Sequence, residues 1–392
     1  MTVVTVAPST DFFLLDDHLT PQELEVRDRV RAFCDAEVLP IAEEYWERAE
    51  LPMQLLPGLA GLGILGGTIP GYGCPGMSMA AYGLALQELA RADGSLATFV
   101  GVQSSLAMSA IYYCGTEEQR LRWLPPMARL EALGAFGLTE PEVGSDAANL
   151  ETLAVLDGDS YVLNGRKRWI GNGSLCDIAI IWARTEDGKV NGFIVPRETP
   201  GYHAQPIEHK LSKRAIWQAD IELTDCRVPR HNRLSGLPGF KGTATTLMHA
   251  RLGVAWGALG QALACYEIAL DHARRREQFG KPLAAFQLVQ EKLVRMLNNV
   301  TLMQLACLHL SRLRDEGKMT IPMVSLAKLN HSEMAREVAR DARALLGGNG
   351  ILGDRHVMRH LCDLEATYTY EGTYDINLLV VGREITGHSA FR

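Results

Sequence analysis

The chain has 392 residues, of which 47% are hydrophobic and 22% are charged. These proportions are those of an ordinary globular protein, and they exclude collagen-like, low-complexity and largely disordered chains. The formal net charge of -7 argues against nucleic acid as the main partner, so a polyanionic ligand would need a local cluster of basic residues.

The eight cysteines are scattered and include no Cys-x-x-Cys pair. They therefore predict neither a zinc framework nor a disulfide scaffold, and we expect no metal site. Residues 1–15 lack the cationic start of a signal peptide, and no apolar run is expected to span a bilayer. We expect a cytoplasmic protein with reduced thiols and no membrane partner.

The first part of the chain, residues 21 to about 130, has the pattern of helices. Thr20 and Glu23 have the spacing of a capping box at the start of the first helix. Apolar residues then recur at three-to-four spacing through residues 77–92 and 115–130. This part is predicted to be helical.

The middle and the end of the chain differ in the secondary structure that their sequences predict. Residues 134–233 contain short β-rich runs separated by Asn-Gly, Asp-Gly and Pro-Gly turns, whereas long helical patterns fill residues 242–392. This order does not alternate strand and helix, which disfavours a doubly wound sheet. The predicted class is α+β, with a helical domain at 1–132, a β domain at 133–238 and a helical bundle at 239–392.

Three stretches match the dinucleotide pattern Gly-x-Gly-x-x-Gly, at residues 61–66, 71–76 and 348–353. The pattern carries weight only between a strand and a helix, where phosphate meets the helix N-terminus. None of the three has that context, so a Rossmann domain is disfavoured.

Two stretches of the middle part are candidates for binding a flat ring. Residues 134–152 are rich in small and hydroxyl side chains, among them Thr139 and Ser145, although an ordinary polar loop would look the same. Trp169 stands near the end of a predicted strand, where its indole could cover a ring or pack in the core.

Two stretches of the last part are candidates for binding phosphates. Residues 273–290 place three arginines at a helix end, which suits the helix dipole but also forms a guanidinium fork for pyrophosphate. Residues 342–354 supply glycines that allow close backbone approach, although they also fit a helix that ends at Gly347.

Near the C-terminus, Glu371 lies between Tyr370 and Gly372, just before an apolar helical run. Aromatic and apolar flanks are typical of a carboxylate at the rim of an apolar pocket. An ordinary loop glutamate is the alternative.

Taken together, these stretches resemble the acyl-CoA dehydrogenase family over essentially the whole chain. The resemblance is carried by LTEPEVGSD at 138–146, RREQFGKPLAAFQ at 275–287 and LLGGNGI at 345–351. The end, YTYEGTYDINLLVVGREITG, resembles the glutaryl-CoA dehydrogenase branch and the related plant short-chain acyl-CoA oxidases.

This resemblance implies an N-terminal helical domain, a central β-barrel-like domain and a C-terminal four-helix bundle. It also implies a homotetramer whose FAD is bound partly by a neighbouring subunit. The implied reaction, a step of fatty acid metabolism, is the α,β-dehydrogenation of an acyl-CoA thioester to trans-2-enoyl-CoA. The electrons would pass to an electron-transfer flavoprotein.

The resemblance also assigns roles to individual residues, with Glu371 as the catalytic base. The thioester oxygen would accept a hydrogen bond from the backbone N–H of the base, as in an oxyanion hole. The implied substrate-binding residues are Ser145, Arg251, Tyr370 and Gly372. The implied FAD-binding residues are Phe136, Leu138, Thr139, Gly144, Ser145, Trp169, Ile170, Gly171, Arg276, Gln278, Phe279, Phe286, Gln287, Ala344, Gly347, Gly348, Thr373 and Asp375.

Three positions qualify the resemblance. Some members place the base just before the arginine matched by Arg251, but Ala250 stands there, which favours Glu371. Gly171 replaces a threonine whose hydroxyl bonds the flavin, and the plant oxidases share this glycine, so an oxidase that uses oxygen is the alternative. A non-catalytic flavoprotein is a third reading.

The last position concerns the substrate. Ala97 stands where a glutaryl-CoA dehydrogenase carries an arginine for the distal carboxylate. Leu96, Phe99 and Val100, which we expect near the far end of the acyl pocket, supply no cation either. An unpaired carboxylate in an apolar pocket is costly, so a glutaryl substrate is not expected.

Overall fold

The computed structural model describes residues 10–237 and 239–391. The expectation of no signal peptide therefore falls mostly on residues 1–9, which lie outside the described chain. The N-terminal part is mostly helical, as predicted, but it also contains a short hairpin of β1 (Pro70–Gly71) and β2 (Cys74–Pro75). Its helices are α1 (Pro21–Phe33), α2 (Leu39–Arg48), α3 (Leu56–Gly61), α4 (Met79–Ala92), α5 (Gly94–Val100), α6 (Ser109–Cys114) and α7 (Glu117–Ala128), with short helical links η2 (Cys34–Val38) and η4 (Gly101–Met108).

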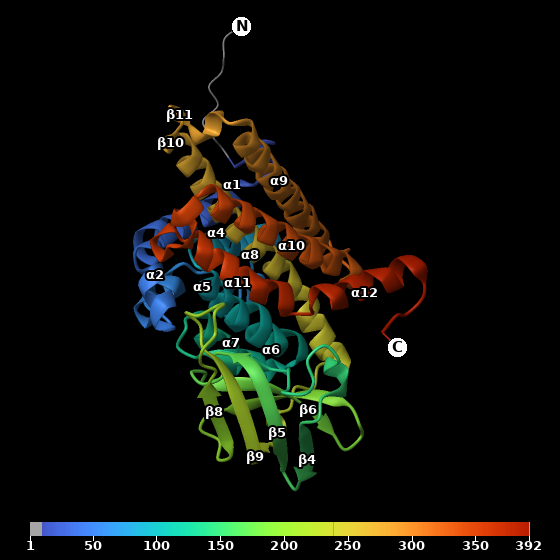
Figure 1. Cartoon of the computed structure of the whole chain (residues 1–392). Coiled ribbons are helices and arrows are strands. Elements are labelled where there is room, and N and C mark those ends of the chain that lie inside the picture. The colour runs from blue at the N-terminus through green and yellow to red at the C-terminus, as the bar shows by residue number, and fades with distance from the viewer. Residues whose placement is uncertain (1–9, 238, 392) are drawn as a thin grey trace.

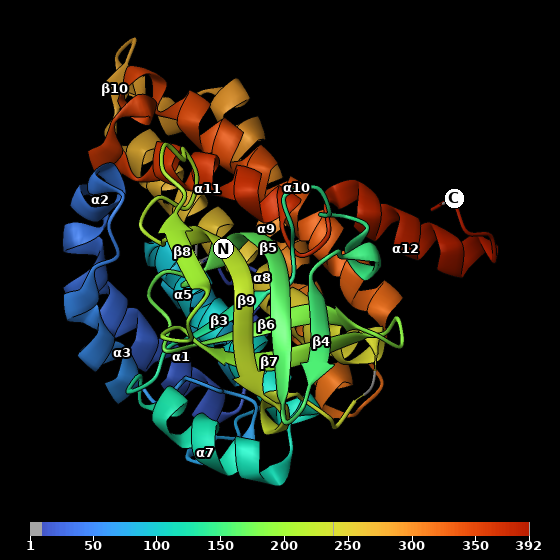
Figure 2. The same cartoon turned by 90° about the horizontal axis from the view of Figure 1, so that it is seen from below.

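The middle part forms one curled seven-stranded sheet, in the order β3-β6-β4-β5-β9-β8 with β7 paired to β6. Its strands are β3 (Gly134–Gly137), β4 (Leu153–Asp157), β5 (Ser160–Gly171), β6 (Ile178–Thr185), β7 (Val190–Pro196), β8 (Tyr202–Pro206) and β9 (Gln218–Pro229). Only the pairings of β6 with β3 and β4 are parallel. Figure 2 shows the sheet beside the helices, and this confirms the α+β class.

Long helices form the last part: α8 (Phe240–Arg275), α9 (Gln287–Asp315), α10 (Ile321–Leu345), α11 (Val357–Thr369) and α12 (Tyr374–Thr386). A hairpin of β10 (Glu277–Gln278) and β11 (Lys281–Pro282) joins α8 to α9. In Figure 1 this hairpin lies at the opposite end of the molecule from the sheet. Helix α8 runs the distance between them.

The N-terminal and C-terminal helices share one hydrophobic core, in which Val30, Phe99 and Trp256 are almost fully buried. Helices α4 and α8 approach closely at two glycines. A Cβ on Gly83 would lie 2.2 Å from the indole nitrogen of Trp256, and one on Gly260 would lie 2.1 Å from the carbonyl oxygen of Gln87. Glycine is therefore required at both places.

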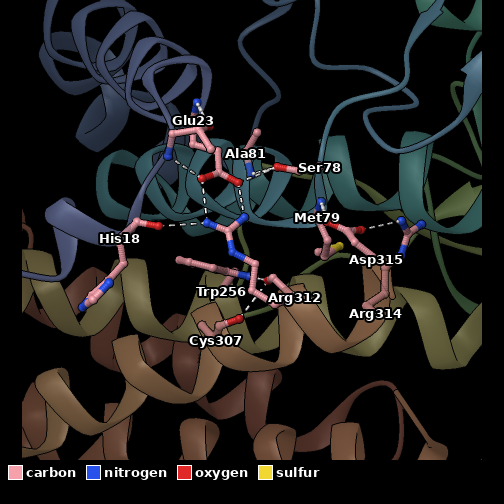
Figure 3. A network of polar contacts seen from close by, with 12 residues as sticks. His18, Glu23, Ser78, Met79, Ala81, Trp256, Cys307, Arg312, Arg314 and Asp315 are labelled. Atoms are coloured by element: carbon pink, nitrogen blue, oxygen red, sulfur yellow. Dashed lines mark hydrogen bonds and ion pairs between the residues drawn. The ribbon is translucent and has the colours of Figure 1, made fainter. Parts of the chain in front are cut away.

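A polar network fastens the N-terminal helices to α9 (Figure 3). Thr20 and Glu23 form the predicted capping box of α1. The Glu23 carboxylate also accepts hydrogen bonds from Ser78 at 2.7 Å and from Arg312 Nη2 at 2.8 Å. Beside it, Asp315 of α9 accepts from the backbone N–H of Met79 at 2.8 Å, at the start of α4.

We expect Glu23→Gln to lower stability by about 2 kcal/mol. This is less than the loss for a fully buried ion pair, because the Arg312 side chain is 36% exposed. Burial alone would raise the pKa of Glu23, but the hydrogen bonds from Arg312, Thr20 and Ser78 lower it to about 2. A depressed carboxyl pKa stabilises the fold above the ordinary value near 4.5, and this stabilisation is lost as the pH falls toward 2.

Urea denaturation of the two proteins at neutral pH and at successively lower pH measures this difference. Glu25→Gln is the matched control, because Glu25 is exposed on the same helix and its one ion pair among the described residues is with Arg29. A difference between wild type and Glu23→Gln that stays constant down to pH 3 would contradict the assigned cause.

One helical run differs from the sequence expectation. By length and composition alone, residues Gly94–Cys114 could cross a membrane, and this is the one such run in the described chain. The expectation that the chain has no apolar run of this kind was therefore wrong on length and composition. Within the molecule, 72% of its most apolar 18-residue stretch is buried. The run is apolar because other elements of the chain pack around it.

Candidate active site

Glu371 lies in a four-residue turn, 370–373, between α11 and α12. Glu371 has a φ of 51° and Gly372 a φ of 86°, so the chain passes through the left-handed region twice. A non-glycine residue there is strained, and such strain is typical of functional sites. The Thr373 hydroxyl caps α12 by accepting from the N–H of Ile376 at 3.1 Å, which fixes the end of the turn.

Side chains from three helices hold the carbonyl groups of this turn. Arg251 of α8 donates from Nε to the carbonyl oxygen of Glu371 at 3.1 Å. Lys328 of α10 donates to the carbonyl oxygen of Gly372 at 2.7 Å, and Asn377 of α12 donates to the same oxygen at 2.8 Å. The carbonyls thus point into the protein. Among the described residues, no hydrogen bond engages the N–H of Glu371.

The carboxyl group of Glu371 has the environment of a base. Its Oε2 is removed from solvent and has no hydrogen-bond partner in the described chain. Burial raises the pKa of Glu371 to about 7, although the positive charges of Arg251 and Lys328 act in the opposite direction. A carboxylate with such a pKa can accept a proton efficiently near neutral pH.

The sheet presents Trp169 as a partly free surface. Strands β5 and β9 shift register between Lys167 and Ile170, and Trp169 lies in this bulge with a φ of 64°. Bulges re-aim side chains next to active sites. The indole is 52% exposed, and the N–H of Arg168 donates to the carbonyl of Thr139 at 2.9 Å. The bulge and the 138–152 loop are therefore fixed to each other.

A buried ion pair supports the same loop. Lys167 donates to Glu140 at 2.7 Å, and Glu140 also accepts from the N–H and the hydroxyl of Thr152. Burial lowers the pKa of Lys167 to about 8. Burial would raise the pKa of Glu140, but Lys167 and the hydrogen bonds keep it below its usual value. Thr139, Gly144 and Ser145 belong to the loop that this pair supports.

The predicted FAD-binding residues fall into two groups in one chain. The loop residues, Trp169 and the turn after Glu371 form the first group. Arg276, Phe279 and the glycines at 347–348 belong to the second, on the hairpin and the link η8 (Gly347–Ile351). Arg251, which touches the Glu371 turn, and the last residue of α8 are 275 − 251 = 24 residues apart, or about 36 Å along the helix.

The second group has open, unpaired surface. Phe279 is 94% exposed, and a Cβ on Gly347 or Gly348 would meet no atom within 4 Å. Arg275 pairs with Asp271, whereas Arg276 enters no ion pair within the described residues. An exposed ring, a free guanidinium and an open backbone suit an aromatic, phosphate-bearing ligand. The half-exposed indole of Trp169 and its neighbouring hydroxyls suit a flat ring, so the residues fit FAD.

Some predicted residues are closed to a ligand. The side chains of Phe136, Leu138 and Ile170 are at most 7% exposed. These residues can therefore contact FAD only through their backbone atoms. Leu96, Phe99 and Val100 are at most 1% exposed within the shared core, and only Ala97 among the four keeps partial exposure. Arg251, expected near the substrate, contacts the turn that carries Glu371.

Sequence reasoning missed Lys328 and Asn377, which are completely buried. A signal was present for the lysine. Lys328 follows Val324 by four residues and precedes His331 by three, so it falls on the buried face of an amphipathic helix. A charge at such a position needs a partner, and the turn supplies it.

A polar cavity lies between α4, η4, α8 and α9, and it has room for about one water molecule. Tyr82, Ser105 and Arg314 are among its lining residues. The hydroxyls of Tyr82 and Ser105 are 2.9 Å apart, and the Glu371 carboxylate adds to the high pKa of Tyr82, which burial raises to about 12. Glu371 is therefore near enough for its charge to act on a residue that lines the cavity.

Comparison with known proteins matches all three parts of the chain. Residues 20–131, 135–226 and 238–386 match the N-terminal, middle and C-terminal domain models of acyl-CoA dehydrogenase. A probable acyl-CoA dehydrogenase of Bacillus subtilis is 37% identical over 94% of this chain and 98% of its own.

Two solved structures from Mycobacterium smegmatis are also similar. A glutaryl-CoA dehydrogenase is 44% identical with a TM-score of 0.95, covering 96% of this chain and 98% of that one. A glutaryl-CoA dehydrogenase in complex with FADH2 is 41% identical with a TM-score of 0.95, covering 97% of this chain and 98% of that one.

Proposed function

The chain belongs to the acyl-CoA dehydrogenase family, and from this membership we propose that it converts an acyl-CoA to the trans-2-enoyl-CoA with Glu371 as the base. The protein is an oxidoreductase that acts on acyl-CoA and uses FAD. The proposal rests above all on the Glu371 carboxyl, whose Oε2 is removed from solvent and has no hydrogen-bond partner in the described chain, and whose pKa is raised by burial to about 7.

In the proposed reaction, the Glu371 carboxylate takes a proton from the α-carbon of the thioester. The free N–H of Glu371 donates to the thioester oxygen and stabilises the negative charge that develops there. Arg251 contributes indirectly, because its hydrogen bond to the Glu371 carbonyl fixes the peptide group that follows the base and so restricts the backbone conformation of Glu371. Bound FAD supplies the acceptor for the two electrons and the hydrogen that leave the β-carbon.

We propose a homotetramer in which the hairpin of one subunit binds the FAD of another. The separation of about 36 Å along α8 supports this, because the two groups of FAD-binding residues in one chain lie too far apart to hold the same FAD molecule. Apolar side chains on α9 and α12 also face outward: Leu288, Val294 and Ile385 are 65–78% exposed. Exposed apolar faces of this kind mark subunit interfaces.

An electron-transfer flavoprotein is the proposed acceptor of the electrons, and oxygen is the alternative. A Cβ on Gly171 would lie 2.8 Å from Cγ2 of Val102, so an apolar side chain occupies the space that a threonine side chain would need at this position. The glycine at position 171, in place of a threonine, is the observation that favours an oxidase as the alternative. The two acceptors differ in whether hydrogen peroxide is released in air.

The experiment mixes the FAD-loaded protein with a panel of acyl-CoA thioesters without oxygen and follows the loss of flavin absorbance. The reduced protein is then offered air or an electron-transfer flavoprotein. Rapid reoxidation by the flavoprotein with little peroxide supports the dehydrogenase. If no thioester bleaches the flavin, the protein is a non-catalytic flavoprotein and the proposal fails.

We expect butyryl- to octanoyl-CoA to reduce the flavin at least about tenfold better than glutaryl-CoA, a difference of about 1.4 kcal/mol. A terminal carboxylate near Ala97 would lose its hydration and gain no cation, whereas each buried methylene of an apolar chain contributes about 0.8 kcal/mol. The specificity constants for flavin reduction measure the ratio. Ala97→Arg should reduce the preference for the apolar thioesters over glutaryl-CoA, because it supplies a cation for the terminal carboxylate.

Efficient oxidation of glutaryl-CoA by the wild type would contradict this reading. The carboxylate would then need another cation, and Arg314 in the polar cavity beside Tyr82 is the described candidate. Arg314→Met tests this candidate. The substitution should lower the rate of glutaryl-CoA oxidation if Arg314 binds the carboxylate, and should leave that rate unchanged if it does not.

A further inference from the structure

Lys328 is a buried cation whose role the proposed reaction leaves unexplained. Its side chain is completely buried in α10, and its ammonium group donates to the carbonyl oxygens of Tyr368 at 3.1 Å and Gly372 at 2.7 Å. Both acceptors are neutral. A lysine that only filled space would not be kept there, because a buried ammonium group is costly without compensation.

The two acceptors lie on either side of Glu371. The carbonyl of Tyr368 belongs to the last turn of α11, where carbonyl groups have no partner within the helix and a cation is favoured by the helix dipole. The carbonyl of Gly372 belongs to the second left-handed residue of the turn. One ammonium group therefore ties the end of α11 to the strained turn.

The charge of Lys328 also acts on the base. The charged groups that act on the Glu371 carboxyl are Arg251 of α8 and Lys328 of α10, and Tyr82 of α4 is the nearby phenol that responds to it. Burial lowers the pKa of Lys328 to about 7, while Glu371 acts to raise it and Arg251 to lower it further. Arg251 and Lys328 thus oppose the effect of burial on the base.

We propose that Lys328 is a positioning residue for the base. It holds the 370–373 turn in the orientation that presents the Glu371 carboxyl and N–H to the thioester, and its charge stabilises the carboxylate. This inference rests on the proposed role of Glu371. It adds a residue that touches neither the substrate nor the reacting atoms.

The sign of the expected effect follows from the charges. Removing the ammonium group removes one of the two cations that favour the Glu371 carboxylate, so the pKa of Glu371 should rise. The base then becomes active only at higher pH. The rate of flavin reduction in Lys328→Met should fall about tenfold on the acidic side of neutrality, with the limb of the pH profile displaced upward by about one unit.

The test measures the limiting rate of flavin reduction and the apparent Kd for one acyl-CoA across the neutral pH range, in the FAD-loaded protein. Lys328→Met should lower the rate and change the Kd by less than about threefold. Lys328→Arg keeps the positive charge. The acidic limb of its pH profile for flavin reduction should therefore lie close to that of the wild type. Lys318→Met is the control, because Lys318 is exposed and, within the described part of the chain, forms an ion pair with Glu316 alone.

A second readout does not depend on turnover. Infrared difference spectroscopy with pH detects the protonated carboxyl of Glu371, identified by its absence in Glu371→Gln. Its titration should move upward in Lys328→Met. If that variant does not fold, Lys328→Gln retains a donor without the charge and should show the same displacement.

An unchanged pH limb and an unchanged infrared titration in a folded Lys328→Met protein would overturn the inference. So would a loss of stability or FAD content with a normal rate, because that is a purely structural role. If no acyl-CoA reduces the wild-type flavin, the proposed function fails instead, and the infrared titration still decides whether Lys328 acts on Glu371.

Discussion

Replacing Glu371 by glutamine is expected to lower the rate of flavin reduction by acyl-CoA by at least about 10³-fold, while the fold and FAD content are retained. The amide has nearly the same shape as the carboxyl but cannot accept the α-proton. The substitution breaks no side-chain hydrogen bond of Oε2, because that atom has no partner in the described chain. Rapid mixing without oxygen measures the rate.

Two further variants sharpen this result. Glu371→Asp keeps the carboxyl but withdraws it by one methylene, and a misplacement of about 1 Å can cost about 10²-fold in rate, so an intermediate value is expected. Glu365→Gln is the control, since Glu365 is exposed near the end of α11 and pairs with Arg336. Flavin reduction at nearly the wild-type rate in Glu371→Gln would refute the assignment.

The pH dependence of the same reaction follows from the buried base. Because burial raises the pKa of Glu371 to about 7, the fraction of carboxylate grows as the pH rises through that value. Flavin reduction in the wild type should therefore increase from acidic to neutral pH and then level off. This rise in the wild-type rate with pH is the reference with which the pH profiles of the Lys328 variants are compared.

Replacing Arg276 by alanine should weaken FAD retention by about 10- to 100-fold, the equivalent of losing one charge-assisted hydrogen-bond pair of about 1.5–3 kcal/mol. Arg276 is exposed at the end of α8 and enters no ion pair among the described residues, so its fork is free for a pyrophosphate. Since that pyrophosphate is proposed to belong to a neighbouring subunit, the tetramer should weaken as well.

FAD content after gel filtration and the molecular mass in solution measure both effects. Arg275→Ala is a matched control, because Arg275 is the adjacent residue and is neutralised by Asp271. It should retain both FAD and the tetramer. An Arg276→Ala protein that keeps full FAD as an intact tetramer would contradict the cross-subunit role.

The sequence by itself determined the features that depend on local pattern. The order of helices, sheet and helices followed from apolar periodicity and turn residues. The start of α1 followed from Thr20 and Glu23, because a capping box is made within one turn of chain. The motif stretches also indicated the family before any contact was known, and the three domain models confirm it.

Only the tertiary structure decided how these pieces act together. The run at 94–114 is apolar enough for a membrane by composition, and its burial within the chain is what explains it. Trp169 is turned outward by a register shift between β5 and β9, which depends on the partner strand. The separation of the two groups of FAD-binding residues likewise follows from the length and course of α8.

The environment of the base is the clearest case. Arg251, Lys328 and Glu371 are far apart in the sequence, and no spacing pattern links them. They meet because α8 and α10 pack against the turn that follows α11, and because two residues with positive φ turn the carbonyls of that loop toward the two cations. Burial and charge at that meeting point, both products of packing, set the pKa of Glu371.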